Sequence, residues 1–141
     1  MKDSKELSSM ILGAAFRVHT GLGPGLLESA YLICLAFELR EKGLFVEVEK
    51  PIPLIYKDME LNCGYRLDMV VEKSIVLEIK SVETLLPIHT AQLLTYLKLS
   101  GYHLGLLLNF NVELLKHGIR RVINGYRDPQ EKALCPLCTL W

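Results

Sequence analysis

The sequence predicts a single α/β domain in which helices flank a mixed β-sheet. The chain has 141 residues, half of them apolar and 23% charged, so it is long enough for one buried core. Helical periodicity fills the first 42 residues, and short strand-like segments follow. Residues 104–110 form a continuous apolar run, which is typical of a strand buried on both faces. The order helix, helix, strands, helix, strand therefore favours a sheet covered by helices.

Two helices are expected in the N-terminal third of the chain. The first spans residues 5–20, with Ser4 available as its cap and apolar residues at helical spacing (Leu7, Ile11, Ala14, Ala15 and Val18). The glycine-rich run GLGPG at 21–25 interrupts the chain. A second helix spans residues 26–42 and stops at Gly43. Its apolar residues lie on nearly every side, so we expect it to be largely buried.

The remaining segments alternate between strands and turns, with one more helix. Strands are expected at 45–49, 52–56, 60–71 and 75–82, separated by turns that include 57–58 and 72–74. A loop containing Pro87 leads to a helix at 89–100, which ends before Gly101. The buried strand at 104–110 follows, and then a short edge strand at 118–123. Residues 1–124 are thus predicted to form one domain, and residues 125–141 a C-terminal tail.

Charge and hydropathy exclude several classes of protein. Sixteen basic and sixteen acidic residues give zero net charge, which excludes a strongly cationic protein that coats nucleic acid or anionic membranes indiscriminately. A local basic groove stays open, with Arg66, His89 and Lys98 as candidates. No apolar run reaches the length of a membrane span. Acidic residues near the N-terminus do not fit a secretory signal, so a cytoplasmic protein without a membrane partner is expected.

The cysteines predict neither a disulfide framework nor a zinc site. Cys34 and Cys63 stand alone in apolar or strand-like sequence and are expected to be buried apolar residues. Cys135 and Cys138 form one CPLC motif, but no second pair of ligands completes a tetrahedral site. His19, beside the glycine-rich run, is interpreted as a residue that packs a loop.

Charged residues concentrate in the two strands that flank the turn at 72–74. Side chains alternate along a strand, so Glu78 and Lys80 share one face while Ile79 lies on the other. A hairpin centred near Lys73 brings Asp68 beside Glu78. Two close carboxylates in an apolar setting repel, so either one takes up a proton or both bind a hard cation such as Mg²⁺. The alternative is an ion pair of Lys80 with Asp68 or Glu78 on a solvated sheet face.

Two helices contribute further candidates. Glu28 lies near the start of the second helix, where the alternative is a surface residue favoured by the helix dipole. Gln92 and Tyr96 are four residues apart and therefore share one helix face. Their alternative is an amide and a phenol at the boundary of a packed helix.

Taken together, these segments resemble a known family. Gly25-x-x-Glu28-x-x-Tyr31 within HTGLGPGLLESAY resembles the signature of the GxxExxY family, which is assigned to the PD-(D/E)XK nuclease superfamily. The resemblance extends from residue 19 to about residue 124 and implies a restriction-endonuclease-like fold. It implies Asp68 as the first acid, Glu78-x-Lys80 as the ExK motif, and Gln92-x-x-x-Tyr96 as the motif of the RecB-like branch. Leu67 stands where the superfamily motif has proline.

The resemblance implies a Mg²⁺- or Mn²⁺-dependent phosphodiester hydrolase that acts on DNA, with RNA as the alternative. Asp68, Glu78, Glu28 and the carbonyl of Ile79 would hold one or two ions, which activate water and neutralise phosphate charge. Lys80 would orient the attacking water or stabilise the transition state. Gln92 and Tyr96 would contact phosphate or fix a catalytic side chain.

Two other functions are weighed against hydrolysis. One is a catalytically idle module that binds nucleic acid or protein on the same fold, and zero net charge favours it. The other is a structural or oligomerising domain that packs the apolar 104–110 region against a partner. Self-association of the enzyme itself is left open.

Overall fold

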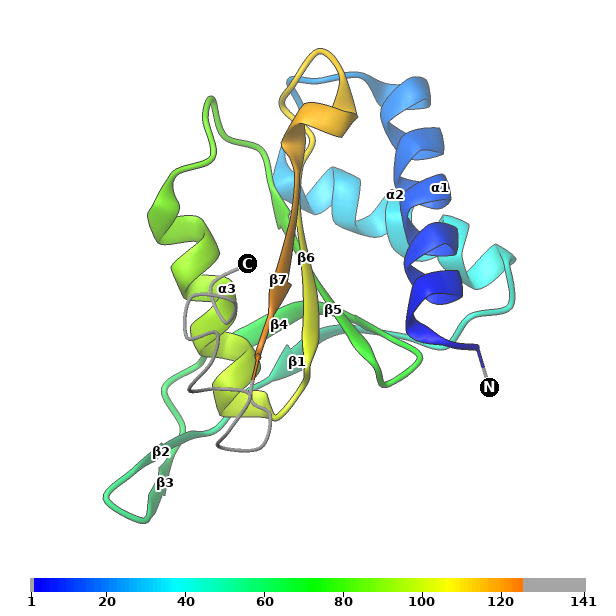
Figure 1. The fold of residues 1–141 in the computed structure, drawn as a ribbon. Helices are drawn as coiled ribbons and strands as arrows, with labels where there is room; N and C mark the ends of the chain where they lie inside the picture. Colours follow the sequence, from blue (N-terminus) through cyan, green and yellow to red (C-terminus); the bar gives the residue numbers. More distant parts are fainter. Residues whose placement is uncertain (1, 126–141) are drawn as a thin grey trace.

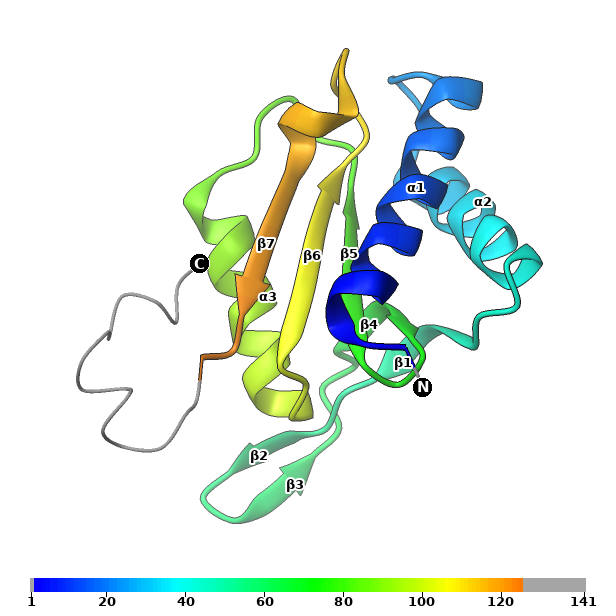
Figure 2. The ribbon, with the colours of Figure 1, turned by 45° about the vertical axis from the view of Figure 1, so that its right-hand side comes forward.

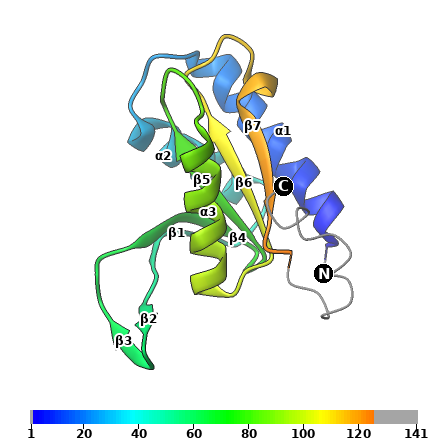
Figure 3. The same cartoon turned by 60° about the vertical axis from the view of Figure 1, so that its left-hand side comes forward.

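A five-stranded mixed sheet separates two layers of helices (Figure 1). The computed structural model describes residues 2–125. In sheet order the strands are β1 (Val46–Pro51), β4 (Arg66–Val71), β5 (Ile75–Lys80), β6 (Leu104–Asn109) and β7 (Ile119–Ile123). The helices α1 (Ser4–Leu22) and α2 (Glu28–Glu41) cover one face, and α3 (Pro87–Ser100) covers the other (Figures 2 and 3). This is the restriction-endonuclease-like α/β architecture that the sequence predicted.

Each helical layer encloses its own hydrophobic cluster. The cluster between α1, α2 and the sheet contains Ile11, Tyr31 and Leu35 together with the odd-numbered residues of β5. The cluster beneath α3 contains Leu93 and Leu97 together with Val76. Alternation along β5 therefore sends its odd-numbered side chains toward α1 and α2 and its even-numbered ones toward α3. Glu78 and Lys80 consequently belong to the α3 face.

The two N-terminal helices depart from the prediction in their cap and in their exposure. The cap of α1 is Asp3, not Ser4, because the Asp3 carboxylate accepts the Glu6 N–H at 2.7 Å. The expectation that α2 is largely buried was wrong, since Ile33 and Phe37 are 68% and 62% exposed. One side of α2 packs on α1 and the sheet, and its other apolar side chains face solvent.

The single strand predicted at 60–71 is divided in the structure into β3 (Met59–Leu61), at its start, and β4, at its end. β2 (Leu54–Tyr56) and β3 form a small hairpin that projects from the main sheet (Figure 1). Its turn at Lys57 and Asp58 is where the sequence predicted one. The chain then breaks at Gly64, whose φ of 78° is left-handed and whose N–H is accepted by the Asn62 side chain. Pairing resumes only at β4.

The connections of the central strands decide where the site lies. β4 and β5 form an antiparallel hairpin, whereas β5 and β6 run parallel and are joined through α3. Every residue of β6 is buried between β5 and β7. The interpretation in which the 104–110 region packs against a partner therefore fails, because this strand is internal to the domain.

Smaller differences concern boundaries and cysteines. β5 ends at Lys80, not Val82, α3 begins at Pro87, and a short 3₁₀ helix, η1 (Leu115–Gly118), precedes β7. Cys34 is half-buried and Cys63 is exposed, so neither is the fully buried apolar residue expected. The tail with Cys135 and Cys138 lies outside the described residues. Across residues 2–125, no helix combines the length and apolar character that crossing a bilayer requires.

Candidate active site

The site forms where β4 and β5 part. Their ladder runs from the Val71–Ile75 pair to the Met69–Leu77 pair and stops there. Beyond that point β4 continues to pair with β1, and β5 continues to pair with β6. The next register position brings together Asp68 and Glu78, as a hairpin centred on Lys73 requires. The two carboxyl groups therefore meet in the opening between the strands.

Asp68 spans this opening through its side chain. Its Oδ2 accepts the backbone N–H of Ile79 at 2.8 Å and so replaces the missing ladder bond. Burial raises the pKa of Asp68 above its ordinary value, while the bond from Ile79 and the charge of Lys80 oppose that rise. A carboxylate in this position is both desolvated and anchored.

Glu78 is the most strongly perturbed group of the site. It is 5% exposed, and its buried Oε1 has no hydrogen-bond partner within the described part of the chain. Burial, followed by the neighbouring charge of Asp68, raises the pKa of Glu78 to about 8, although Lys80 lowers it. At neutral pH the Asp68–Glu78 pair therefore retains a proton. An unpartnered buried carboxyl oxygen is costly unless a cation or a proton satisfies it.

Lys80 and the two predicted residues of α3 form a chain of polar contacts. The Lys80 Nζ lies 3.9 Å from Glu78 Oε2 and donates to Gln92 Oε1 at 3.4 Å. Gln92 in turn donates to the Tyr96 hydroxyl at 3.2 Å. Burial, and then the charge of Glu78, raise the pKa of Tyr96. The helical spacing of Gln92 and Tyr96 thus brings both side chains to the same end of β5.

Glu28 reaches the site from the first turn of α2. Its Oε2 accepts the backbone N–H of Ser81 at 3.1 Å, directly after Lys80. Its charge also contributes to the raised pKa of Asp68, so the two carboxylates are close enough to interact. The six residues predicted to act through their side chains therefore surround the exit of β5, as does Ile79, which was predicted to act through its carbonyl (Glu28, Asp68, Glu78, Lys80, Gln92 and Tyr96).

The donor set fits a hard cation with a small protein shell. Among residues 2–125, no three His, Cys, Asp or Glu side chains are arranged as a ready metal cluster. Two acids, however, suffice for Mg²⁺, which keeps several waters and binds substrate phosphate. The unpartnered Glu78 Oε1 is an available ligand. The Ile79 N–H faces Asp68, and in an extended strand the carbonyl of the same residue faces the same edge.

The three residues predicted to line a basic groove lie in separate local settings. Arg66 pairs with Glu49 at 3.4 Å on the surface, and the His89 ring accepts the Leu86 N–H at the start of α3. Lys98 is exposed near the other end of α3. Within residues 2–125, none of these three side chains forms an ion pair or hydrogen bond with Glu28, Asp68 or Glu78.

Sequence analysis missed three residues around the site. Ser81 and Asn109 bind the chain that leaves β5, and both are short polar residues that carry no motif of their own. Tyr65 is 43% exposed and its ring lies 5.9 Å from that of Tyr96. Its position directly before β4 was the available signal, because aromatic rings beside a phosphodiester site can stack on bases.

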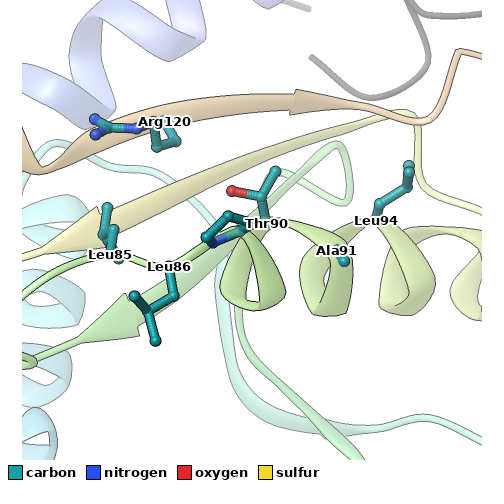
Figure 4. A pocket seen from close by; sticks show the side chains of 7 residues that line it. Leu85, Leu86, Thr90, Ala91, Leu94 and Arg120 are labelled. Atoms are coloured by element: carbon teal, nitrogen blue, oxygen red, sulfur yellow. The ribbon is translucent and has the colours of Figure 1, made fainter.

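An apolar cavity of about 370 Å³ lies apart from these residues, between the start of α3 and β7 (Figure 4). Six residues from the α3 region and Arg120 of β7 line it (Leu85, Leu86, Pro87, Thr90, Ala91 and Leu94). None of the predicted site residues is among them. The carboxylate site and this cavity are separate features.

Comparison with known proteins agrees with the geometry. The family model described as the PD-(D/E)XK nuclease superfamily matches residues 5–122, which covers all the described strands except the last residue of β7. No curated protein and no solved structure matches the chain significantly.

Proposed function

The chain belongs to the PD-(D/E)XK nuclease superfamily, and from that premise we propose that it is a Mg²⁺- or Mn²⁺-dependent phosphodiester hydrolase. The carrying observation is the buried carboxyl group of Glu78 next to the half-buried one of Asp68, with Lys80 beside Glu78. Among residues 2–125 nothing donates a hydrogen bond to Glu78 Oε1, which leaves this oxygen available to an ion. DNA is the proposed substrate, with RNA as the alternative.

Each residue has a proposed role. Asp68 and Glu78, with the Ile79 carbonyl and Glu28, would hold the ion. A bound divalent ion supplies Lewis acidity and lowers the pKa of coordinated water. Lys80 would hold the attacking water or stabilise charge on the phosphate, from a position fixed by its contact with Gln92. Gln92 and Tyr96 would orient Lys80 and contact the substrate backbone.

The finer family placement is also part of the proposal. Glu28 approaches the ion site from the start of α2, within the segment Gly25-x-x-Glu28-x-x-Tyr31, and Gln92 and Tyr96 approach from the opposite layer. These two features support assignment to the GxxExxY family and the RecB-like branch. We further propose a cytoplasmic protein, on the grounds of its sequence composition.

A titration followed by a cleavage assay tests this function. Wild type, Asp68→Asn and Glu78→Gln are titrated with Mn²⁺ and Mg²⁺ by calorimetry. Each is then incubated with labelled single-stranded DNA, duplex DNA and RNA, with the ion or with chelator. Saturable binding and ion-dependent cleavage in wild type, both lost in the two variants, is the expected result.

The idle binding module makes a different prediction in the same experiment. Two observations favour that module. The net charge is zero, and Arg66, His89 and Lys98 do not add positive charge in contact with the carboxylates. The idle module predicts oligonucleotide binding that is equal in wild type and in Glu78→Gln, with no cleavage of any substrate. That outcome would replace hydrolysis with binding.

A further inference from the structure

We propose that Tyr31 and Ser81 are positioning residues that clamp the chain directly after Lys80. The clamp links the glycine-rich segment 23–28 to the exit of β5 through a short series of hydrogen bonds. Its structural part stands on the contacts alone. Its catalytic consequence rests on the function proposed above, and the experiment below separates the two.

Tyr31 fixes the segment that precedes α2. Its side chain is fully buried, and its ring stacks on Phe110 with centroids 4.6 Å apart and planes 9° from parallel. The hydroxyl donates to the Gly23 carbonyl at 2.6 Å and accepts the Leu26 N–H at 3.1 Å. A single buried phenol thus holds both ends of the turn that contains Pro24 and Gly25.

Ser81 is bound by two groups of that same segment. Its hydroxyl donates to the Leu26 carbonyl at 2.6 Å, and its backbone N–H donates to Glu28 Oε2 at 3.1 Å. Both backbone groups of Leu26 are therefore engaged, its N–H by the Tyr31 hydroxyl and its carbonyl by the Ser81 hydroxyl. Movement of one contact moves the other.

Asn109 holds the opposite side of the chain. Its side chain is 1% exposed and makes two bonds with the backbone of Val82, accepting from the N–H at 3.0 Å and donating to the carbonyl at 2.9 Å. The backbone of Lys80 also accepts from Phe110 at 2.9 Å. Residues 80–82 are thus hydrogen-bonded on one side to the start of α2 and the segment before it, and on the other side to the end of β6 and Phe110.

The clamp matters because, in the strands that the structure describes, nothing pairs with the other edge of β5 at this point. The β4 ladder stops at Leu77, so the Ile79 N–H depends on Asp68 and the Ser81 N–H depends on Glu28. Lys80 lies between these two anchored residues. The end of β5 therefore keeps its geometry only while Asp68 and Glu28 are themselves held in position.

Tyr31→Phe is the decisive variant, because it removes the hydroxyl and retains the stacked ring. Amide hydrogen exchange is measured on metal-free protein, which needs neither substrate nor ion. We expect exchange at Ser81 to accelerate at least tenfold, while the Val76 and Leu77 amides in the same strand stay unchanged. Ser81→Ala, at a less buried position, is the second variant and should accelerate exchange at Leu26.

Cleavage provides the second readout. We expect both variants to lose about tenfold in turnover, and the double variant to lose no more than either single one, because the two hydroxyls hold the backbone of the same residue, Leu26. Val122→Ala, a core change on β7, is the control for lost stability and should retain turnover. Restored turnover in Ser81→Thr, which retains a hydroxyl, would support positioning.

The outcomes separate the two proposals. Unchanged Ser81 exchange in Tyr31→Phe would overturn the clamp, whatever the enzyme does. Accelerated exchange with no cleavage in wild type would sustain the clamp and reject the hydrolase. Accelerated exchange with full turnover in both variants would sustain hydrolysis and reject the positioning role.

Discussion

Asp68 and Glu28 occupy consecutive hydrogen-bonding positions along one edge of β5. Asp68 accepts the N–H of Ile79, and Glu28 accepts the N–H of Ser81, two residues further on. Both carboxylates thereby take the place of a neighbouring strand. This arrangement explains how acidic groups collect at an edge of the sheet without leaving its backbone unpaired.

The Asp68 contact predicts different stabilities for two substitutions in the absence of metal. In Asp68→Asn the amide oxygen still accepts from Ile79 and the repulsion with Glu78 is gone, so the free energy of unfolding should equal or exceed that of wild type. In Asp68→Ala the Ile79 N–H loses its partner, at a cost of about 1–3 kcal/mol. Urea unfolding in chelator measures both, and equal stability of the two variants would contradict the backbone role.

The raised pKa of Glu78 predicts that metal-free protein loses stability as pH rises. The folded state keeps the proton up to about pH 8, whereas the unfolded chain releases it near 4.5. Between these values the folded state binds more protons, so stability falls by up to about 1.4 kcal/mol per pH unit and levels off above pH 8. Glu78→Gln should remove this slope. Unfolding curves from pH 4.5 to 9 test this prediction. A wild-type free energy of unfolding that rises with pH over this range would refute the raised pKa of Glu78.

The same proton predicts a pH-dependent ion affinity. At pH 7 the ion must displace about one proton from the Asp68–Glu78 pair, so affinity should rise about tenfold per pH unit and level off above pH 8. Mn²⁺ titrations in buffers of different ionisation enthalpy count the released protons. Proton release near zero at pH 7 would mean that the ion does not bind at Glu78.

Lys80 is predicted to serve turnover, with little part in holding the ion. Its Nζ approaches Glu78 Oε2 only to 3.9 Å, so Lys80→Met should retain Mn²⁺ affinity. Cleavage should fall about 100-fold or more, the size of effect seen when one donor that stabilises transition-state charge is removed. Lys116→Met, at an exposed position of η1, is the matched control. Normal cleavage by Lys80→Met would remove this residue from the mechanism.

Two buried glycines predict unequal costs for the same substitution. A Cβ on Gly118 would collide with the backbone carbonyl of Asn109, which cannot move away without disturbing β6. A Cβ on Gly105 would lie 3.1–3.2 Å from the Leu93 side chain, which has to shift by only a few tenths of an ångström. Gly118→Ala should cost about 1–3 kcal/mol and Gly105→Ala clearly less. Thermal unfolding of the two variants compares them, and the reverse order would refute this account.

The sequence was sufficient to predict those residue pairs of the site that depend only on the periodicity of a strand or a helix. Alternation in VLEIK and a turn near Lys73 were sufficient to bring Asp68 beside Glu78, because register follows from the centre of a short hairpin. Spacing of four likewise brought Gln92 and Tyr96 to one contact. These inferences needed no knowledge of how the helices pack.

Long-range geometry was beyond such patterns. The exposure of Ile33 and Phe37 depends on the angle at which α2 meets α1, which apolar content does not specify. The roles of Ser81 and Asn109 arise from segments 53 and 27 residues apart in the chain. The break at Gly64 was missed because a strand pattern does not reveal where pairing ends.

The parting of β4 from β5 has a consequence for how the protein folds. The site is complete only when α2, α3 and the end of β6 have packed against the β4–β5 hairpin. Because these contacts are distant in the sequence, we expect the site to form after the hairpin does. Until then Asp68 and Glu78 only repel each other. A divalent ion that binds the completed site but not the open chain would act as a folding ligand, and its concentration would help set how much of the protein is native.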